Sequence, residues 1–327
     1  MRWCSRALSA ASVAAVLLVA LAMLLFTPGP AIASQSELVW QPRPSDPAAL
    51  TRMYGLNQSA MKAAGAPFAK WTGHGSQYLA FDARGNGRVV EVFGNLAAAN
   101  RIAVLVPGVS TTADNFNTGL DGVRDRAPAV QARALYDATR VAAPGEHVAV
   151  IAWLGYDAPQ GVGRTAAREE LARAGATALD KFTADLAIMS PNARVTVIGH
   201  SYGSVVAGLA AASLPSQVRD LVVVGSPGMG VSRVADLHTS AHVWAGQAAQ
   251  DWIDWVPAVQ VWGAGHGTLP ATSGFGARVF GTNGVIDHDH YLAPGTQSLA
   301  NIVSIVLGRD SLVTGPNSVA LPIQASG

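Results

Sequence analysis

One short motif constrains the fold of this chain more than any other feature. An apolar run, Val195–Ile198, is followed by Gly-His-Ser-Tyr-Gly at residues 199–203 and then by a stretch of small residues. A strand that turns directly into a helix forces its central residue, Ser201, into strained backbone geometry, and the flanking glycines avoid steric clashes. The motif therefore predicts a strand–turn–helix unit that presents the Ser201 hydroxyl at the carboxyl end of a β-strand.

Strands and helices alternate along the rest of the chain. Apolar runs bounded by turn residues predict eight strands, several of them apolar enough to be covered on both faces. The predicted strands are 77–81, 88–93, 101–106, 147–153, 194–198, 220–224, 242–245 and 277–280. Helices are predicted at 127–142, 165–189, 202–213 and 297–307, with one or two more within 48–70. This pattern predicts an α/β fold with a mostly parallel, doubly wound sheet and helices on both faces.

The composition favours a large buried core over disorder. Of the 327 residues, 50% are hydrophobic and only 13% are charged, which is typical of a globular chain. The formal net charge is +1, and no basic cluster is longer than two residues. We therefore expect no nucleic-acid partner.

The first 33 residues have the organisation of an export signal. Arg2 and Arg6 precede an apolar stretch, 7–26, which is followed by helix breakers and by small residues that end at Ala33. This arrangement predicts cleavage after Ala33 and a secreted or envelope location, with no stable membrane span once the signal is removed. The apolar stretch is also just long enough to cross a bilayer, so an uncleaved anchor is the alternative.

Removal of the signal would leave a chain without cysteine, because Cys4 is the only one. Disulfides, cysteine nucleophiles and thiolate metal sites are then excluded together. We expect residues 34–88 to form an amino-terminal elaboration, residues 89–310 the catalytic domain and residues 311–327 a tail.

Candidate acid and base residues follow the serine in the chain. A serine hydroxyl becomes nucleophilic when a base removes its proton, and a carboxylate orients that base. With an elbow of this kind the order is Ser, Asp, His. Asp251 follows the predicted strand 242–245 and is the preferred acid, with Asp254 as the alternative. His288 follows the last predicted strand and is preferred as the base over His290.

Two backbone N–H groups are needed to stabilise the oxyanion that forms in acyl transfer. The first is expected from Tyr202, directly after the nucleophile. The second is expected from Val109, in the loop after the predicted strand 101–106, where Gly108 allows a close approach to the substrate. The plain alternative is that Pro107 and Gly108 simply form a turn.

Three further features have two interpretations each. The run 287–290, Asp-His-Asp-His, has the composition of a zinc or calcium site, but no second ligand cluster accompanies it, so we expect no metal and no cofactor. Tyr156 and Asp157 either line the pocket or fix their own loop. An apolar substrate wall or ordinary core packing explains the aromatic cluster Trp244, Trp252, Trp255 and Trp262.

Six stretches of the chain, in order, resemble the signatures of a largely uncharacterised actinobacterial α/β-hydrolase family. The resemblance runs from about Val89 to Gly308. In that family a Gly-His pair stands three residues before an aromatic residue, which corresponds here to His288 and Tyr291, although Asp287 replaces the glycine and His290 is additional. The six stretches are 106–108, 111–116, 153–159, 199–203, 225–228 and 275–278.

The resemblance implies an α/β-hydrolase fold and serine-hydrolase chemistry with no defined substrate. We interpret the chain as an exported serine hydrolase that cleaves a carboxylic ester or related acyl bond in a small molecule or lipid. Acyl transfer to an envelope sugar or lipid through the same acyl-enzyme is the first alternative. A non-catalytic binding protein on a hydrolase scaffold is the second.

Overall fold

A computed structural model describes residues 47–73, 75–255, 265–316 and 318. The predicted export signal, residues 1–33, lies outside the described residues. Within them, every helix is too short or too polar to cross a bilayer.

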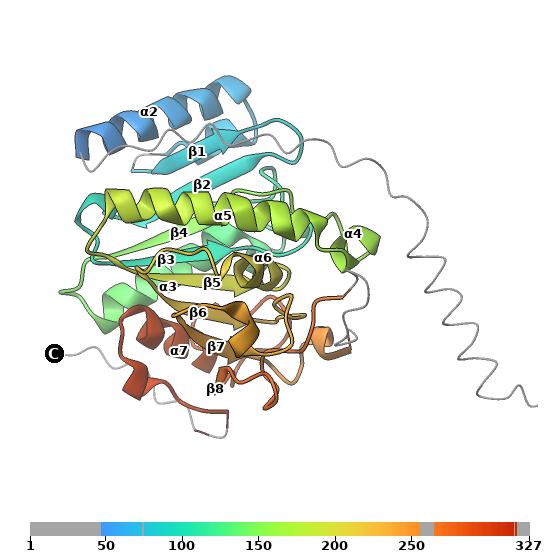
Figure 1. Cartoon of the computed structure of the whole chain (residues 1–327). Helices are drawn as coiled ribbons and strands as arrows, with labels where there is room; N and C mark the ends of the chain where they lie inside the picture. Colours follow the sequence, from blue (N-terminus) through green and yellow to red (C-terminus); the bar gives the residue numbers. More distant parts are fainter. Residues whose placement is uncertain (1–46, 74, 256–264, 317, 319–327) are drawn as a thin grey trace, which may run out of the picture.

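Eight strands form one sheet in the order β1-β2-β4-β3-β5-β6-β7-β8 (Figure 1). Their bounds are β1 (Tyr78–Asp82), β2 (Arg88–Gly94), β3 (Arg101–Val106), β4 (Val148–Leu154), β5 (Arg194–His200), β6 (Val218–Val224), β7 (His242–Gly246) and β8 (Arg278–Phe280). Strand β2 is antiparallel to β1 and β4, and the other neighbours are parallel. The predicted mostly parallel sheet is thus confirmed. Strand β1 lies in the stretch expected to be an elaboration, yet it pairs with β2 as part of the same sheet.

Helices cover both faces of the sheet, as predicted. Helices α5 and α6 pack on one face and α3 and α7 on the other (Figure 1). Alternate strand residues supply the two cores, so Val104 packs with the α5 side and Leu105 with the α3 side. The α-helices are α2 (Pro47–Ala64), α3 (Pro128–Ala142), α4 (Arg164–Ala167), α5 (Glu170–Met189), α6 (Gly203–Ala210) and α7 (Gln297–Val306). The 3₁₀ helices are η1 (Phe68–Trp71), η2 (Leu96–Ala98), η3 (Leu120–Gly122), η4 (Arg124–Arg126), η5 (Val234–Leu237), η6 (Trp252–Trp255) and η7 (Asp310–Leu312).

The helix predicted over 165–189 is interrupted between α4 and α5. Carbonyl groups that would accept hydrogen bonds from the next helical turn are instead occupied by distant donors. His266 Nε2–H donates to Ala166 O at 2.7 Å, and Gly265 N–H donates to Ala167 O at 2.8 Å. The prediction of one continuous helix was wrong because these long-range donors are not visible in a local pattern.

The six parallel strands, β3 to β8, point the same way, so the loops that follow them meet at one edge of the sheet. Ligands of open α/β sheets bind at this carboxyl edge. The candidate residues Ser201, Asp251 and His288 all follow parallel strands and are therefore brought to it.

Strand β2 contains a buried carboxyl group, Glu91. Burial raises the pKa of Glu91 to about 7, and a hydrogen bond with Tyr78 and the charge of Arg133 only partly oppose this. The usual value, which applies to the unfolded chain, is 4.5. The native state therefore binds this proton more tightly than the unfolded state, so stability falls as the pH rises through this interval.

We expect Glu91→Gln to remove this pH-dependent loss, because glutamine stays neutral and can still accept a hydrogen bond from Tyr78. Relative to the wild type, the variant should gain about 2–3 kcal/mol in free energy of unfolding between pH 5 and pH 8. Urea unfolding of both proteins at the two pH values measures this. A constant difference between the two proteins would show that Glu91 does not titrate in this interval.

Candidate active site

Ser201 occupies the tight turn between β5 and α6. Its φ angle is +54°, a left-handed conformation that is uncommon for residues other than glycine. Its backbone N–H donates to Val224 O of β6 at 3.0 Å. Helix α6 passes so close to β3 that a Cβ atom on Gly203 would lie 2.2 Å from Val106 O. The predicted strand–turn–helix unit is therefore present, and its geometry excludes a side chain at Gly203.

The loop after β3 lies directly against the serine. A Cβ atom on Gly108 would be 2.6 Å from Ser201 Cβ and 3.1 Å from Ser201 Oγ. Among the described residues, neither the Val109 N–H nor the Tyr202 N–H donates a hydrogen bond. Within the described residues, both N–H groups are thus free of hydrogen bonds. Val109 directly follows Gly108, and Tyr202 directly follows Ser201. Their role as oxyanion donors stays a prediction.

Tyr156 and Asp157 connect the loop after β4 to the loop after β3 and to strand β2. The Tyr156 hydroxyl is buried and donates to Pro107 O at 2.6 Å. Asp157 Oδ2 forms an ion pair with the buried Arg88 at 2.6 Å. These contacts agree with the interpretation that Tyr156 and Asp157 fix their loop.

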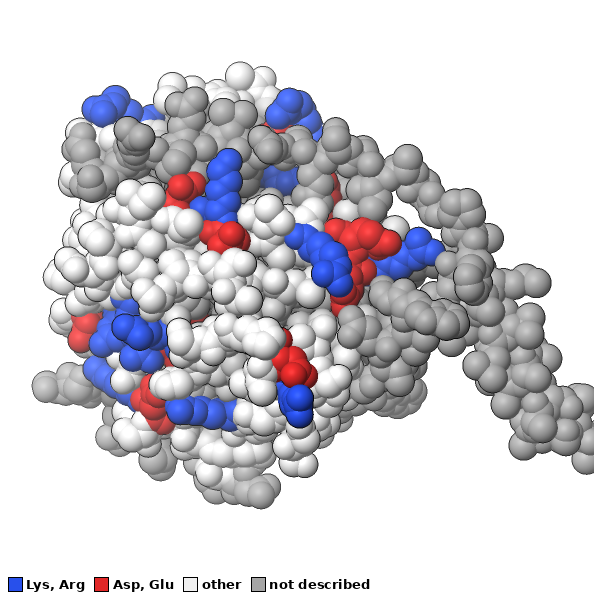
Figure 2. Space-filling model, in the orientation of Figure 1, with Lys and Arg blue, Asp and Glu red and all other residues white. Residues whose placement is uncertain are grey.

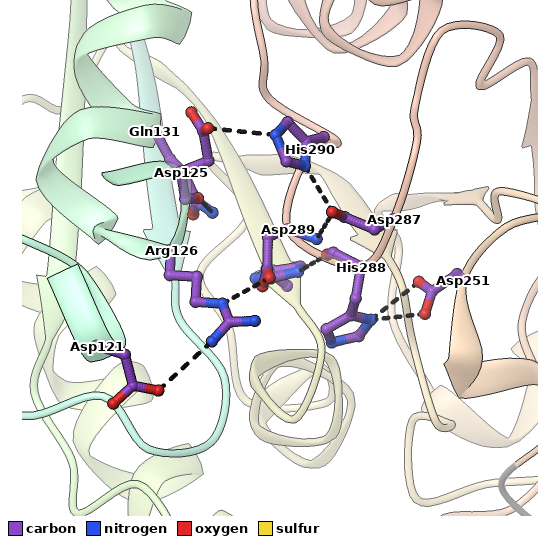
Figure 3. Close-up of polar contacts among 10 residues, drawn as sticks. Asp121, Asp125, Arg126, Gln131, Asp251, Asp287, His288, Asp289 and His290 are labelled. Atoms are coloured by element: carbon purple, nitrogen blue, oxygen red, sulfur yellow. Dashed lines mark hydrogen bonds and ion pairs between the residues drawn. The ribbon is translucent and has the colours of Figure 1, made fainter. Parts of the chain in front are cut away.

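The loops after β7 and β8 bring Asp251 and His288 into contact (Figure 3). His288 Nδ1 lies 2.8 Å from Asp251 Oδ1 and 2.9 Å from Oδ2. The carboxylate also accepts hydrogen bonds from the Tyr291 hydroxyl at 2.7 Å and from Ile253 N–H at 2.9 Å. Burial alone would raise the pKa of Asp251, but the hydrogen bond and charge of His288 and these other donors lower it below its usual value. Asp251 is thus held as the ionised partner of His288 Nδ1.

The other ring nitrogen, His288 Nε2, is buried and has no hydrogen-bond partner among the described residues. His288 and Ser201 line the same pocket, although no hydrogen bond joins Nε2 to Ser201 Oγ within the described part of the chain. Such contacts are often long in ligand-free enzymes and shorten when substrate binds. The geometry therefore leaves Nε2 available to accept the serine proton.

His200, the last residue of β5, holds the backbone of His288. Its Nε2 lies 2.7 Å from His288 O, so this nitrogen carries the proton and donates it to the carbonyl. Burial, and secondarily the charge of His288, lowers the pKa of His200 to about 4. His200 is therefore neutral at pH 7. It fixes the His288 main chain, whereas Asp251 fixes the His288 ring.

We expect the hydrogen bond from His200 Nε2 to His288 O to affect kcat. The His200→Phe variant should lower kcat by about 10–100-fold, because it leaves the buried carbonyl without a donor and loosens the His288 loop. The His200→Gln variant should stay within a few-fold of wild type, because its side-chain N–H can reach the same carbonyl. Steady-state kinetics and thermal melting of both variants test this. Equal losses in the two variants would show that packing, rather than the hydrogen bond, matters at this position.

His290 is held away from Asp251 (Figure 3). Its Nδ1 lies 2.6 Å from Asp287 Oδ1, and its Nε2 lies 3.2 Å from Asp125 Oδ2. The hydrogen bond with Asp287 raises the pKa of His290. Both ring nitrogens are thus engaged on a different side of the loop. The side chain of Asp254, the alternative acid, lies outside the described part of the structure.

The metal interpretation of the run 287–290 does not match the directions of its side chains. His288 faces Asp251, while Asp289 accepts a hydrogen bond from Arg126 at 2.7 Å. Among the described residues, a group with metal-ligand spacing occurs elsewhere, at Asp220, His242 and Asp310. There Asp220 already pairs with Arg194 at 2.7 Å and accepts from Trp244 Nε1 at 3.0 Å. That group is an ion-pair network at the opposite edge of the sheet.

A pocket of about 300 Å³ is lined by the candidate residues Ser201, His288 and Val109, whereas Asp251 and Tyr202 are not among its lining residues. Trp252 forms part of its wall, and the Trp252 ring packs against the His288 ring with centroids 4.8 Å apart. Trp244 is buried in the core, in agreement with the core-packing interpretation for this residue. The side chain of Trp255 and all of Trp262 lie outside the described residues. The lining residues are 107–111, 115, 120, 126, 131, 161, 162, 200, 201, 252, 288 and 289.

Two supporting residues were not assigned from the sequence. Tyr291 was visible only as the aromatic residue of the family pattern, and its hydrogen bond to Asp251 depends on the fold. His200 was visible only as a variable position of the serine motif. Neither position has a local pattern that predicts its partner.

Comparison with known proteins identifies relatives of the chain. An uncharacterized protein of Mycobacterium tuberculosis strain H37Rv is 30% identical over 277 residues, which cover 74% of this chain and 40% of that protein. An uncharacterized protein of Mycobacterium bovis is 33% identical over 147 residues, covering 44% of this chain and 53% of that protein. The chain thus spans about two fifths of the first relative and about half of the second.

Two solved structures are similar at low identity. An α/β serine hydrolase without lid from Xanthomonas campestris shares 14% identity with a TM-score of 0.39, covering 72% of this chain and 94% of that one. A Pyrobaculum calidifontis esterase shares 16% identity with a TM-score of 0.41, covering 83% and 95%. A family model described as "Alpha/beta hydrolase" matches residues 82–261. Because this match covers more than half of the chain, the protein belongs to this alpha/beta hydrolase family.

Proposed function

We propose that the protein is an exported serine hydrolase that cleaves a carboxylic ester or a related acyl bond. The observation that carries this proposal is the juxtaposition, in one pocket, of a serine with φ of +54° and a histidine whose Nδ1 is held by a buried carboxylate. The family match supports hydrolysis. The amino-terminal sequence supports export.

In the first half of the reaction, Ser201 Oγ attacks the carbonyl carbon while His288 Nε2 accepts the hydroxyl proton. Asp251 stabilises the resulting imidazolium through Nδ1. The backbone N–H groups of Tyr202 and Val109 stabilise the oxyanion, and the N-terminal end of α6 adds its dipole. When the carbon–oxygen bond to the leaving alcohol breaks, His288 returns the proton to that oxygen.

In the second half, a water molecule attacks the acyl carbon and gives a proton to His288 Nε2. Collapse of the second tetrahedral intermediate breaks the bond to Ser201 Oγ, and His288 returns the proton to it. The products are a carboxylic acid and the regenerated serine. No other group is required for the proton balance.

A hydrolysis screen of p-nitrophenyl esters, from acetate to palmitate, tests the proposal with the purified protein. We expect ester-dependent release of p-nitrophenol that a serine-directed phosphonate abolishes. Release that the phosphonate leaves unchanged, or none from any chain length, would contradict the proposed chemistry.

Mass spectrometry of the exported protein should find an amino terminus at Ser34, whereas full-length protein in the membrane fraction would indicate an anchor.

A further inference from the structure

Large apolar side chains are exposed at two kinds of place in the described residues. Four lie on α2, α3, α5 and η7, namely Leu56, Val141, Ile188 and Leu312. The other four lie in the connections that follow the parallel strands β3, β4, β7 and β8. We call these four the apolar rim. They are Val123, Val162, Trp252 and Ile286.

The apolar rim borders the pocket that contains Ser201. Val162 and Trp252 line the pocket themselves. Val123 lies between Leu120 and Arg126, which both line it, and Ile286 lies two residues before His288. Four separate segments of the chain therefore place an exposed apolar side chain at or beside one opening.

The segments of Val123 and Ile286 are also joined to each other. His290 lies 3.2 Å from Asp125, which is two residues after Val123, and 2.6 Å from Asp287, which directly follows Ile286. The same segments are linked by Arg126 and Asp289 at 2.7 Å (Figure 3). These contacts hold the two rim segments side by side and leave Val123 and Ile286 in solvent.

The charges of the rim segments do not favour an anionic surface. The two linked rim segments, residues 120–126 and 286–290, contain four aspartates and two arginines, together with His288 and His290. Figure 2 shows one face of the molecule, on which basic side chains lie in groups with acidic ones beside them. Because acidic side chains outnumber basic ones in these two segments, they do not offer the cationic excess that binds anionic lipid headgroups, and the apolar rim is suited to a neutral apolar surface.

We propose that the apolar rim docks this protein on aggregates of an uncharged ester, so that the substrate is presented to the pocket from a droplet surface. The inference rests on the proposed ester hydrolysis for its catalytic consequence. Docking itself depends only on the rim, because transfer of exposed apolar side chains from water to the droplet is favourable. Turnover should therefore rise when the ester passes its solubility limit.

Droplet binding tests the docking step without catalysis. The full chain carrying Ser201→Ala is mixed with tributyrin droplets coated with phosphatidylcholine, and the bound fraction is measured after flotation. Addition of Val123→Ser and Ile286→Ser should weaken partitioning about tenfold. The matched control, Val141→Ser with Ile188→Ser, replaces the same residue types at the far ends of α3 and α5. Ile188 is 64% exposed and Ile286 65% exposed, so the control should bind like the parent.

Equal binding of the rim variant and the parent would overturn the proposal, and so would binding that requires phosphatidylserine and disappears in high salt. The apolar residues 7–26 are the same in all variants, so they cannot produce a difference between them. Melting temperatures exclude unfolding as a cause of weaker binding.

Turnover tests the catalytic consequence. With the Ser201 chain, the rate against tributyrin concentration should rise steeply above the solubility limit, and the ratio of emulsion to soluble turnover should fall about tenfold in the rim variant only. Saturation below the limit with no further rise would overturn the proposal. If droplets are bound through the rim but no ester is cleaved, the proposed function fails and the docking surface stands.

Discussion

Replacement of Ser201 by alanine is expected to lower ester turnover by about 10⁴–10⁶-fold, because the acyl-enzyme cannot form without the hydroxyl oxygen. The fold should be unaffected, since the backbone N–H to Val224 O bond is retained. Steady-state kinetics with p-nitrophenyl esters, alongside thermal melting, measure both effects.

Ser204 provides a matched control for this variant. It lies three residues later, is fully buried, and its hydroxyl donates to Gly199 O at 3.2 Å. Ser204→Ala should cost a modest amount of stability and leave most of the turnover. Near wild-type turnover in the Ser201 variant would refute the assignment of the nucleophile.

Replacement of His288 by alanine should cost about as much as loss of the serine, because the two side chains act as one unit. Replacement of His290 should cost about tenfold or less, since that side chain contacts Asp287 and Asp125 rather than Asp251. The combined variant Ser201→Ala/His288→Ala should be no slower than either single variant. Kinetics of all four proteins, with melting curves, provide the comparison.

The reverse ranking of the two histidines would move the general base to His290 and contradict the geometry at Asp251. Equal losses that depend on added zinc would favour the metal interpretation of the run 287–290. An additive loss in the double variant would show that the serine and the histidine do not act in the same step.

Strand positions could be predicted because the parallel strands are continuous apolar runs. Strand β3 was predicted with its observed bounds, since Arg101 and Pro107 mark its two ends. The break between α4 and α5 could not be predicted. It depends on His266 and Gly265, which lie about a hundred residues away in the chain.

In the candidate site too, local sequence patterns predicted some residues, whereas others depend on contacts between distant segments. Ser201, Asp251 and His288 could be selected because each follows an apolar strand in the expected order, and the structure brings Asp251 and His288 together. The hydrogen bonds of His200 and Tyr291 could not be predicted, because each joins segments far apart in the chain that meet only at the carboxyl edge of the folded sheet. Their roles depend on tertiary contacts rather than on residue type.

Labelling of the native protein with a fluorophosphonate tests the central claim most directly, because the reagent requires an activated serine and no knowledge of the substrate. We predict a single adduct, located by peptide mass spectrometry on Ser201, that is absent from heat-denatured protein and from the Ser201→Ala variant. An adduct on another serine, or no adduct on protein that melts cooperatively, would contradict the account.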